Sequence, residues 1–330
     1  LFNSAAGNDI LFDTGIPKSQ KPEDIEAFMQ DAESHNSKLC EQGRNFANKI
    51  WNAFRLIKGW ETTPDSSTEG SEAVVWFEAR LQEALAEIED HFTKYRISEA
   101  LQSIYKLFWD DYCAWYLEIV KPEYGQPISQ EVYDKSVNFL DQLLRILHPF
   151  MPFITEEVWQ NIAPRQENES ICVAEYPKVV AFDKTILQEA ELAFEAVSQI
   201  RNLRNAHNIS PKEQLEIVVK KSENEVQLQK WQGIIAKLAN ARLSFASENP
   251  EQGLKFLVKT EEFFAKIAVE IDLEQVKKDL AYYQGFRESV SKKLANEKFV
   301  ANAKPEIVEN ERQKLADAEA KIKSLEEMLS

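Results

Sequence analysis

The chain has 330 residues, enough for two or three domains of roughly 100–150 residues each. With 44% hydrophobic residues, few glycines and prolines and no apolar stretch of membrane-spanning length, we expect a mainly helical protein without a membrane partner. The three cysteines form no CxxC pair, which argues against a zinc knuckle and suits a reducing cytoplasm. Because the first residue is Leu1 and not Met, we expect a piece of something longer.

The charge is unevenly distributed along the chain. The net charge of −16 disfavours a nucleic-acid partner only if it is spread evenly. Residues 37–60 carry a net charge of +4, whereas residues 61–91 carry −8. A local basic face is therefore expected in the first of these segments.

The first half of the chain is predicted to form an antiparallel helical bundle. Residues 1–36 have weak periodicity and are expected to be an irregular lead-in. Helical repeats of apolar residues then predict four to five consecutive helices joined by short loops. These helices cover residues 37–58, 72–91, 96–120, 133–147 and 152–162, within a bundle domain at 37–163.

The second half is predicted to contain two different architectures. Residues 164–184 are expected to be a linker, followed by a small α+β module at 185–270. Heptad repeats at 271–330, interrupted near Pro305, predict an antiparallel coiled-coil hairpin. Each of its helices would extend roughly 40 Å.

The sequence provides no recognisable reaction centre. It contains no P-loop, GxSxG or HExxH motif, and its four histidines are far apart. His148, before Pro149, is interpreted as a residue at a helix end. No catalytic residue, metal ligand or cofactor of this chain is therefore predicted.

One polar face of the first helix suits nucleic acid. At about 100° per residue, five side chains fall within roughly 40° of one line, and that line is roughly 115° from the apolar stripe. They are Lys38, Asn45, Lys49, Asn52 and Leu56. Ammonium groups hold phosphates and amides read unpaired bases, although an ordinary solvated face would look the same.

Two further groups of residues have alternative interpretations. Aromatic residues recur along the third helix, either as core or as stacking surfaces for bases: Tyr105, Trp109, Tyr112, Trp115 and Tyr116. Basic residues gather in the first half of the hairpin and its tip, either for solvation and helix pairing or for a polyanion: Lys277, Lys278, Arg287, Lys292, Lys293 and Lys298.

Three segments together resemble the valyl-tRNA synthetase family. They are Gly43–Asn52 (GRNFANKIWN), His148–Trp159 (HPFMPFITEEVW), and Lys293–Val300 (KLANEKFV) with the following PEIVE at Pro305–Glu309. Ser4–Asp9 is also similar to the stretch after that family's catalytic domain. The bundle motifs alone leave the valine, isoleucine and leucine enzymes open, whereas the hairpin and the absence of cysteine pairs favour valine.

The resemblance implies a C-terminal fragment that recognises tRNA. The family's HIGH and KMSKS motifs are absent, and so is its editing domain, so the fragment would neither activate valine nor edit. The parent enzyme would attach valine to its tRNA with ATP and Mg²⁺, as a cytoplasmic monomer. A non-enzymatic helical scaffold, with protein partners bound to its coiled coil, is the alternative from another functional class.

The same resemblance assigns roles to individual residues. Lys38 and Lys49 would bind the anticodon loop, and Leu117 and Glu118 would approach it from the third helix. Many relatives have Phe at the position of Leu56, so here a stacking contact would become an apolar one. The hairpin resembles an arm that rests on the tRNA elbow and meets phosphates through four basic residues: Arg287, Lys292, Lys293 and Lys298.

Overall fold

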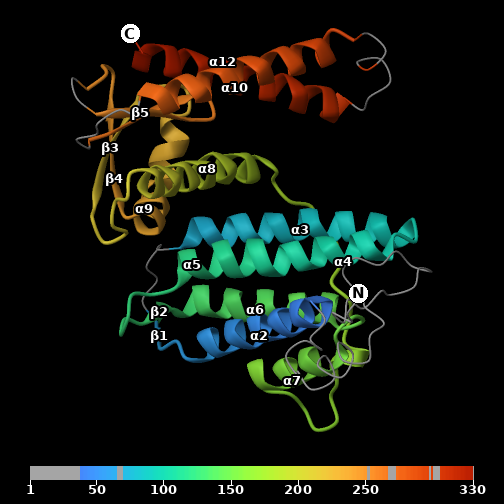
Figure 1. Ribbon diagram of the computed structural model, residues 1–330. Coiled ribbons are helices and arrows are strands. Elements are labelled where there is room, and N and C mark those ends of the chain that lie inside the picture. Colours follow the sequence, from blue (N-terminus) through green and yellow to red (C-terminus); the bar gives the residue numbers. More distant parts are fainter. Residues whose placement is uncertain are drawn as a thin grey trace, which may run out of the picture. The chain divides into compact units, whose positions relative to one another are not determined.

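The protein is described from a computed structural model (Figure 1). The structure describes residues 38–64, 70–250, 253–266, 273–296, 299 and 305–329. The predicted lead-in at 1–36, the segment Ser4–Asp9 and Lys298 lie outside these ranges. The chain divides after Leu187 into two compact units, each of which is described by itself.

The first unit contains the predicted helical bundle. Its elements are α2 (Lys38–Lys58), α3 (Ser71–Thr93), α4 (Ile97–Lys106), the π-helix η1 (Leu107–Tyr116), α5 (Leu117–Val120), α6 (Gln130–Leu147) and α7 (Pro152–Ile162). α3 packs on α4, η1 and α6, while α2 packs on η1, α6 and α7 (Figure 1). Two short strands, β1 (Thr62–Thr63) and β2 (Ile128–Ser129), pair in parallel.

Aromatic side chains fill the bundle core. Phe46, Phe77 and Phe108 are fully buried, as are Tyr112 and Tyr116. The ring of Phe46 lies 5.7 Å edge-on to Phe108, and the ring of Phe77 lies 5.2 Å from Tyr112. Such rings remove large apolar areas from water, which is the main driving force for burying the apolar stripe of α2.

The third predicted helix is helical throughout but is not a single α-helix. Residues 107–116 form a π-helix, which the apolar spacing did not predict. Within it, the Tyr112 hydroxyl donates to the Ser136 carbonyl at 2.9 Å. The Ser136 hydroxyl donates to the Val132 carbonyl, so it accepts the hydrogen bond of Tyr116 at 2.8 Å. These bonds satisfy both buried phenols and anchor η1 to α6.

Residues 163–184 lie on the bundle and belong to the first unit. Arg165 pairs with Asp141 of α6 at 2.7 Å, and the Val180 amide donates to Gln82 of α3 at 2.8 Å. Between them, the 3₁₀ turn η2 (Ile171–Val173) buries Ile171. The sequence predicted a linker here because single polar contacts over long sequence distances leave no periodic signal.

The second unit begins with an α+β module. Its elements are α8 (Thr185–Ala206), β3 (Leu215–Lys220), α9 (Glu225–Ala239), β4 (Ala241–Ala246), β5 (Leu254–Val258) and β6 (Glu261–Ala265). The sheet order is β4-β3-β6-β5. β3 and β4 are parallel and are connected through α9, whereas β6 is antiparallel to both β3 and β5. Arg204 of α8 donates to the carbonyls of Ala239 and Asn240 and so ties α8 to the end of α9.

The chain ends in the predicted hairpin, formed by α10 (Leu273–Leu294) and α12 (Pro305–Leu329). Lys293, near the end of α10, pairs with Glu311, near the start of α12, at 3.0 Å, so the helices are antiparallel. Val290, Val308 and Ile322 are buried, as the heptad pattern predicts. α12 also contacts β5. The mainly α architecture with a small sheet is thereby confirmed, and no helix in the described ranges is long and apolar enough to cross a membrane.

Candidate nucleic-acid interface

The polar face predicted for the first helix lies at the surface of α2. We call Asn45, Lys49, Asn52 and Leu56 the α2 face. Asn45 and Asn52 are exposed, while Lys49 and Leu56 are half-buried. Lys38 is the first residue of α2, and its side chain is outside the described part of the chain. Ile50 and Ile57, on the other side of the helix, are fully buried, so α2 has the amphipathic orientation that helical geometry predicts.

Two aromatic rings lie beside Lys49. Its ammonium is 5.2 Å from the centre of the Trp109 ring, within cation–π range. Trp109 stacks on Tyr105 at 5.5 Å with an interplanar angle of 18°. Both rings are half-buried, unlike Tyr112 and Tyr116 in the core. A cation and two partly accessible rings thus adjoin the amides of α2, a combination that suits an unpaired nucleotide.

A pocket of about 410 Å³ lies at the Leu56 end of the α2 face. Leu56 and Trp60 line one part of it, and Lys121 and Tyr124, from the segment after α5, line another. The Tyr124 side chain is fully exposed. The pocket therefore combines apolar and aromatic groups with the cation of Lys121 and the carboxylates of Glu61 and Glu123, at the point where α2 meets the end of the third predicted helix.

The two residues assigned to the third helix have different environments. The Glu118 carboxylate is exposed and pairs with Lys121 at 2.7 Å, so it adjoins the same pocket through Lys121. Leu117 is only 2% exposed. Its side chain packs in the core and has no surface for a base, so the structure does not support the direct contact expected of Leu117.

The basic residues of the hairpin also differ in accessibility. Lys292 is exposed, and Arg287 is half-buried. Lys293 pairs with Glu311 and lies 5.0 Å over the Phe299 ring, so its charge is partly engaged within the hairpin. Hydrogen bonds from Lys314 and Lys293 lower the pKa of Glu311, which keeps this pairing charged. Lys292 and Lys293 are thus both exposed, but part of the charge of Lys293 is engaged within the hairpin.

The His148–Trp159 motif is structural in this fold. His148 follows the last residue of α6, as expected for a helix-end residue, and its Nδ1 lies 2.7 Å from the Thr155 hydroxyl. Trp159 lies beneath the guanidinium of Arg165, 3.5 Å from its ring centre. The motif therefore fixes the corner between α6 and α7 and holds the segment after α7.

Comparison with known proteins identifies two parts of the chain. Residues 75–219 match the family model of the anticodon-binding domain of tRNA ligases, and residues 269–330 match that of the valyl-tRNA synthetase tRNA binding arm. The chain belongs to the valyl-tRNA synthetase family. This match favours the valine enzyme among the three that the bundle motifs left open, because the matched arm is that of valyl-tRNA synthetase.

Relatives that match all or most of the chain support the same family. The valine–tRNA ligases of Parabacteroides distasonis and Christiangramia forsetii are 45% and 42% identical to this chain over its whole length. The valine–tRNA ligase of Pseudothermotoga lettingae is 34% identical over 87% of the chain. The chain spans about 36% of the length of the first two relatives and corresponds to their C-terminal region, so it is a tRNA-recognition region of this family.

Sequence reasoning found the α2 face but missed its surroundings. The anticodon-binding match begins at residue 75, after α2, so helical geometry and the GRNFANKIWN segment were the local signals for this face. The contributions of Trp60, Lys121 and Tyr124 could not be read from spacing. These residues follow helix ends and come together only through the packing of α2 against the third helical segment.

Proposed function

We propose that the first unit binds the anticodon loop of valine tRNAs, with the α2 face and the adjoining pocket as the contact surface. The observation that carries this proposal is the Lys49 ammonium over Trp109, flanked on α2 by the exposed amides of Asn45 and Asn52. The ammonium would hold phosphate, and the amides would meet base edges.

The pocket at the Leu56 end of the α2 face would hold an unstacked base. Leu56 contributes apolar contact, and the exposed ring of Tyr124 offers a π-face. Glu118 adds an acceptor nearby, since a carboxylate accepts hydrogen bonds from exocyclic amino groups. Lys38 would extend the basic surface toward the start of α2.

In this proposal, the hairpin contacts the elbow of the same tRNA. Lys292, Arg287, Lys293 and Lys298 would meet phosphates there. The two contacts, made by separate units, would fix the tRNA so that its acceptor end reaches the active site elsewhere in the enzyme, which is a positioning contribution to catalysis.

The whole enzyme is proposed to be a cytoplasmic monomer that attaches valine to tRNA using ATP and Mg²⁺. Because this sequence contains neither the HIGH nor the KMSKS motif, no residue of this chain is assigned to that reaction. Its part is recognition, and it would need no cofactor for this role.

The Lys49→Ala variant tests the anticodon surface. We expect its affinity for valine tRNA to fall about tenfold, and the salt dependence of binding to weaken by about one released counterion. Binding is measured by filter retention at several salt concentrations, with a thermal melt to verify folding.

Lys58→Ala is the matched control. Lys58 lies nine residues after Lys49 and therefore on the opposite side of α2, where it donates to the Asn161 carbonyl at 3.2 Å. We expect this variant to bind tRNA as the parent does. If Lys49→Ala and the parent bind valine tRNA with equal affinity, Lys49 is not part of the tRNA contact surface.

A further inference from the structure

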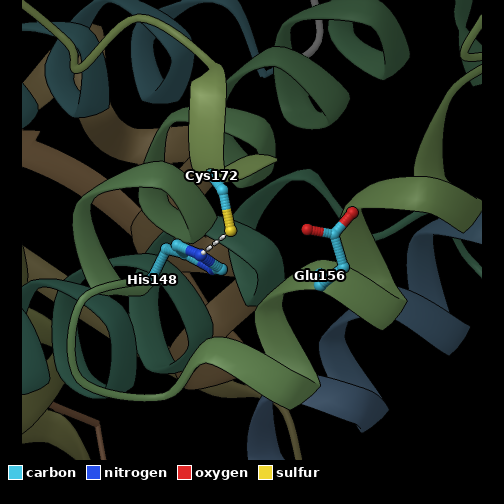
Figure 2. Close-up of side chains that lie close together, drawn as sticks. All are labelled: His148, Glu156 and Cys172. Atoms are coloured by element: carbon cyan, nitrogen blue, oxygen red, sulfur yellow. Dashed lines mark hydrogen bonds between the residues drawn. The ribbon is translucent and has the colours of Figure 1, made fainter. Parts of the chain in front are cut away.

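Three side chains that no assigned function uses converge at the corner between α6 and α7. His148 follows α6, Glu156 lies in α7 and Cys172 lies in the turn η2. One potential donor atom from each lies within 4.8 Å of the others (Figure 2). Figure 2 shows the Cys172 sulfur facing the His148 ring, with the Glu156 carboxylate beside them. Spacing along the chain gave no sign of this group, because the segment that carries Cys172 folds back onto the bundle.

Hydrogen bonding determines which nitrogen of His148 is available. The Thr155 hydroxyl donates to the Met151 carbonyl at 2.8 Å, so it accepts a hydrogen bond from His148 Nδ1 at 2.7 Å. With the proton on Nδ1, the neutral ring directs its Nε2 lone pair toward Cys172 Sγ, 3.2 Å away. An imidazole oriented by a polar partner on its other nitrogen is the usual arrangement of a metal-bound histidine.

The carboxylate of Glu156 is held in place by its own neighbours. It accepts hydrogen bonds from Ser170 Oγ at 2.7 Å, from the Ile171 amide at 3.2 Å and from Gln160 Nε2 at 2.7 Å. A carboxylate has about four lone-pair sites, so one remains for a further ligand. Cys172 is exposed, which leaves an open side for water.

We propose that His148 Nε2, Cys172 Sγ and Glu156 bind a divalent transition-metal cation of the zinc class, with water as the fourth ligand. Thiolate, imidazole and carboxylate are each ligand types that this cation takes in proteins. In a tetrahedral zinc site, the nitrogen and sulfur ligands lie roughly 3.5 Å apart. The observed distance of 3.2 Å between His148 Nε2 and Cys172 Sγ therefore needs to increase by only a few tenths of an ångström. The Glu156 carboxylate would move toward these two atoms.

Binding would replace the hydrogen bond between Cys172 and His148 with two metal–ligand bonds. The thiol proton would pass to solvent when the thiolate binds the cation. The cation would tie η2 directly to the end of α6 and the start of α7. Its expected effect is to stabilise the attachment of residues 163–184 to the bundle, and no step of aminoacylation is assigned to it.

Co²⁺ is the probe that tests this site, since cobalt bound to thiolate absorbs in the near ultraviolet. The full chain, treated with a chelator and then desalted, is titrated with Co²⁺ and afterwards with Zn²⁺. We expect one cobalt per chain with a thiolate absorption band, displacement of the cobalt by Zn²⁺, and a higher melting temperature with Zn²⁺ than without it.

Two cysteine variants separate this site from adventitious binding. Cys172→Ser should lose the thiolate band and the Zn²⁺-induced rise in melting temperature. Cys40→Ser should keep both, because Cys40 is also an exposed thiol but belongs to no such ligand group in the described part of the chain. No thiolate band in the parent, or an unchanged band in Cys172→Ser, would overturn the proposal.

Discussion

At the residue scale, burial divides the aromatic side chains of the third helical segment into two groups. Tyr112 and Tyr116 are fully buried, and their hydroxyls bond to Ser136, so they are core residues. Tyr105 and Trp109 are half-buried and adjoin Lys49. The sequence could not make this distinction, since all four residues recur at helical spacing.

Phe108 tests the assignment of the core. It is fully buried in η1 and makes an edge contact with Phe46 of α2. Phe108→Ala removes this packing and leaves a cavity, so we expect the free energy of unfolding to fall by about 3–5 kcal/mol. Urea denaturation measures the loss, and Tyr124→Ala is the control because Tyr124 is fully exposed. A loss for Phe108→Ala no larger than that for the control would contradict its role in the core.

Cys113 provides a second test at this scale. Burial raises the pKa of its thiol to about 12, although the charge of Lys49 acts in the opposite direction. At pH 8 this thiol is protonated and inaccessible, so it should not react with a thiol reagent. In the presence of a chelator, we expect two thiols per native chain to react, from Cys40 and Cys172, and three in denaturant. Rapid reaction of all three native thiols would show that the core around Cys113 opens.

At the element scale, periodicity predicted most helices to within a few residues. The apolar stripe of α2 and the heptads of α10 and α12 are strong local signals, because each arises from one face buried along a whole helix. The π-helix at 107–116 has no such signal, and the hydrogen bonds of its tyrosines to Ser136 of α6 are tertiary contacts. The packed segment at 163–184 and the approach of Cys172 to His148 likewise depend on tertiary structure.

In the candidate site, too, the sequence predicted the helix face but not the features that depend on tertiary structure. Helical geometry placed Asn45, Lys49 and Asn52 on one face, and the structure confirms that arrangement. Helical geometry could not show that Leu117 is buried while its neighbour Glu118 is exposed. That difference arises from the orientation of α5 after the π-helix, which a regular α-helical projection does not include.

Lys292 tests the role proposed for the hairpin. Lys292→Glu reverses an exposed charge near the hairpin tip and leaves the Lys293–Glu311 pair intact. We expect weaker binding of every tRNA by a similar factor, because phosphate contacts carry no sequence information. Competition binding with valine and isoleucine tRNAs measures the affinity for each tRNA and the ratio of the two affinities.

Lys278→Glu is the matched control on α10. Lys278 is also exposed and lies two heptads before Lys292, about 21 Å away along the helix. Lys278→Glu should reduce tRNA affinity less than Lys292→Glu if the tRNA elbow contacts the tip of the hairpin. A Lys292→Glu variant that changes the preference between tRNAs would contradict the proposed division of labour.

At the scale of the whole molecule, a strongly acidic chain is proposed to bind a polyanion. The net charge of −16 opposes long-range attraction, so the association must rest on local groups on α2 and the hairpin. Each phosphate contact releases counterions, and affinity should therefore fall steeply as salt is added. A helical scaffold that binds protein through its coiled coil would show no RNA binding with this salt dependence.

Anticodon recognition is tested most directly by measuring how the chain binds three RNAs at one salt concentration. These are a valine tRNA, the same tRNA with its anticodon replaced, and an isoleucine tRNA. We predict the tightest binding to the valine tRNA and a clear loss on replacing its anticodon alone. Equal binding to all three would contradict anticodon recognition by the α2 face and leave only the backbone contacts of the hairpin.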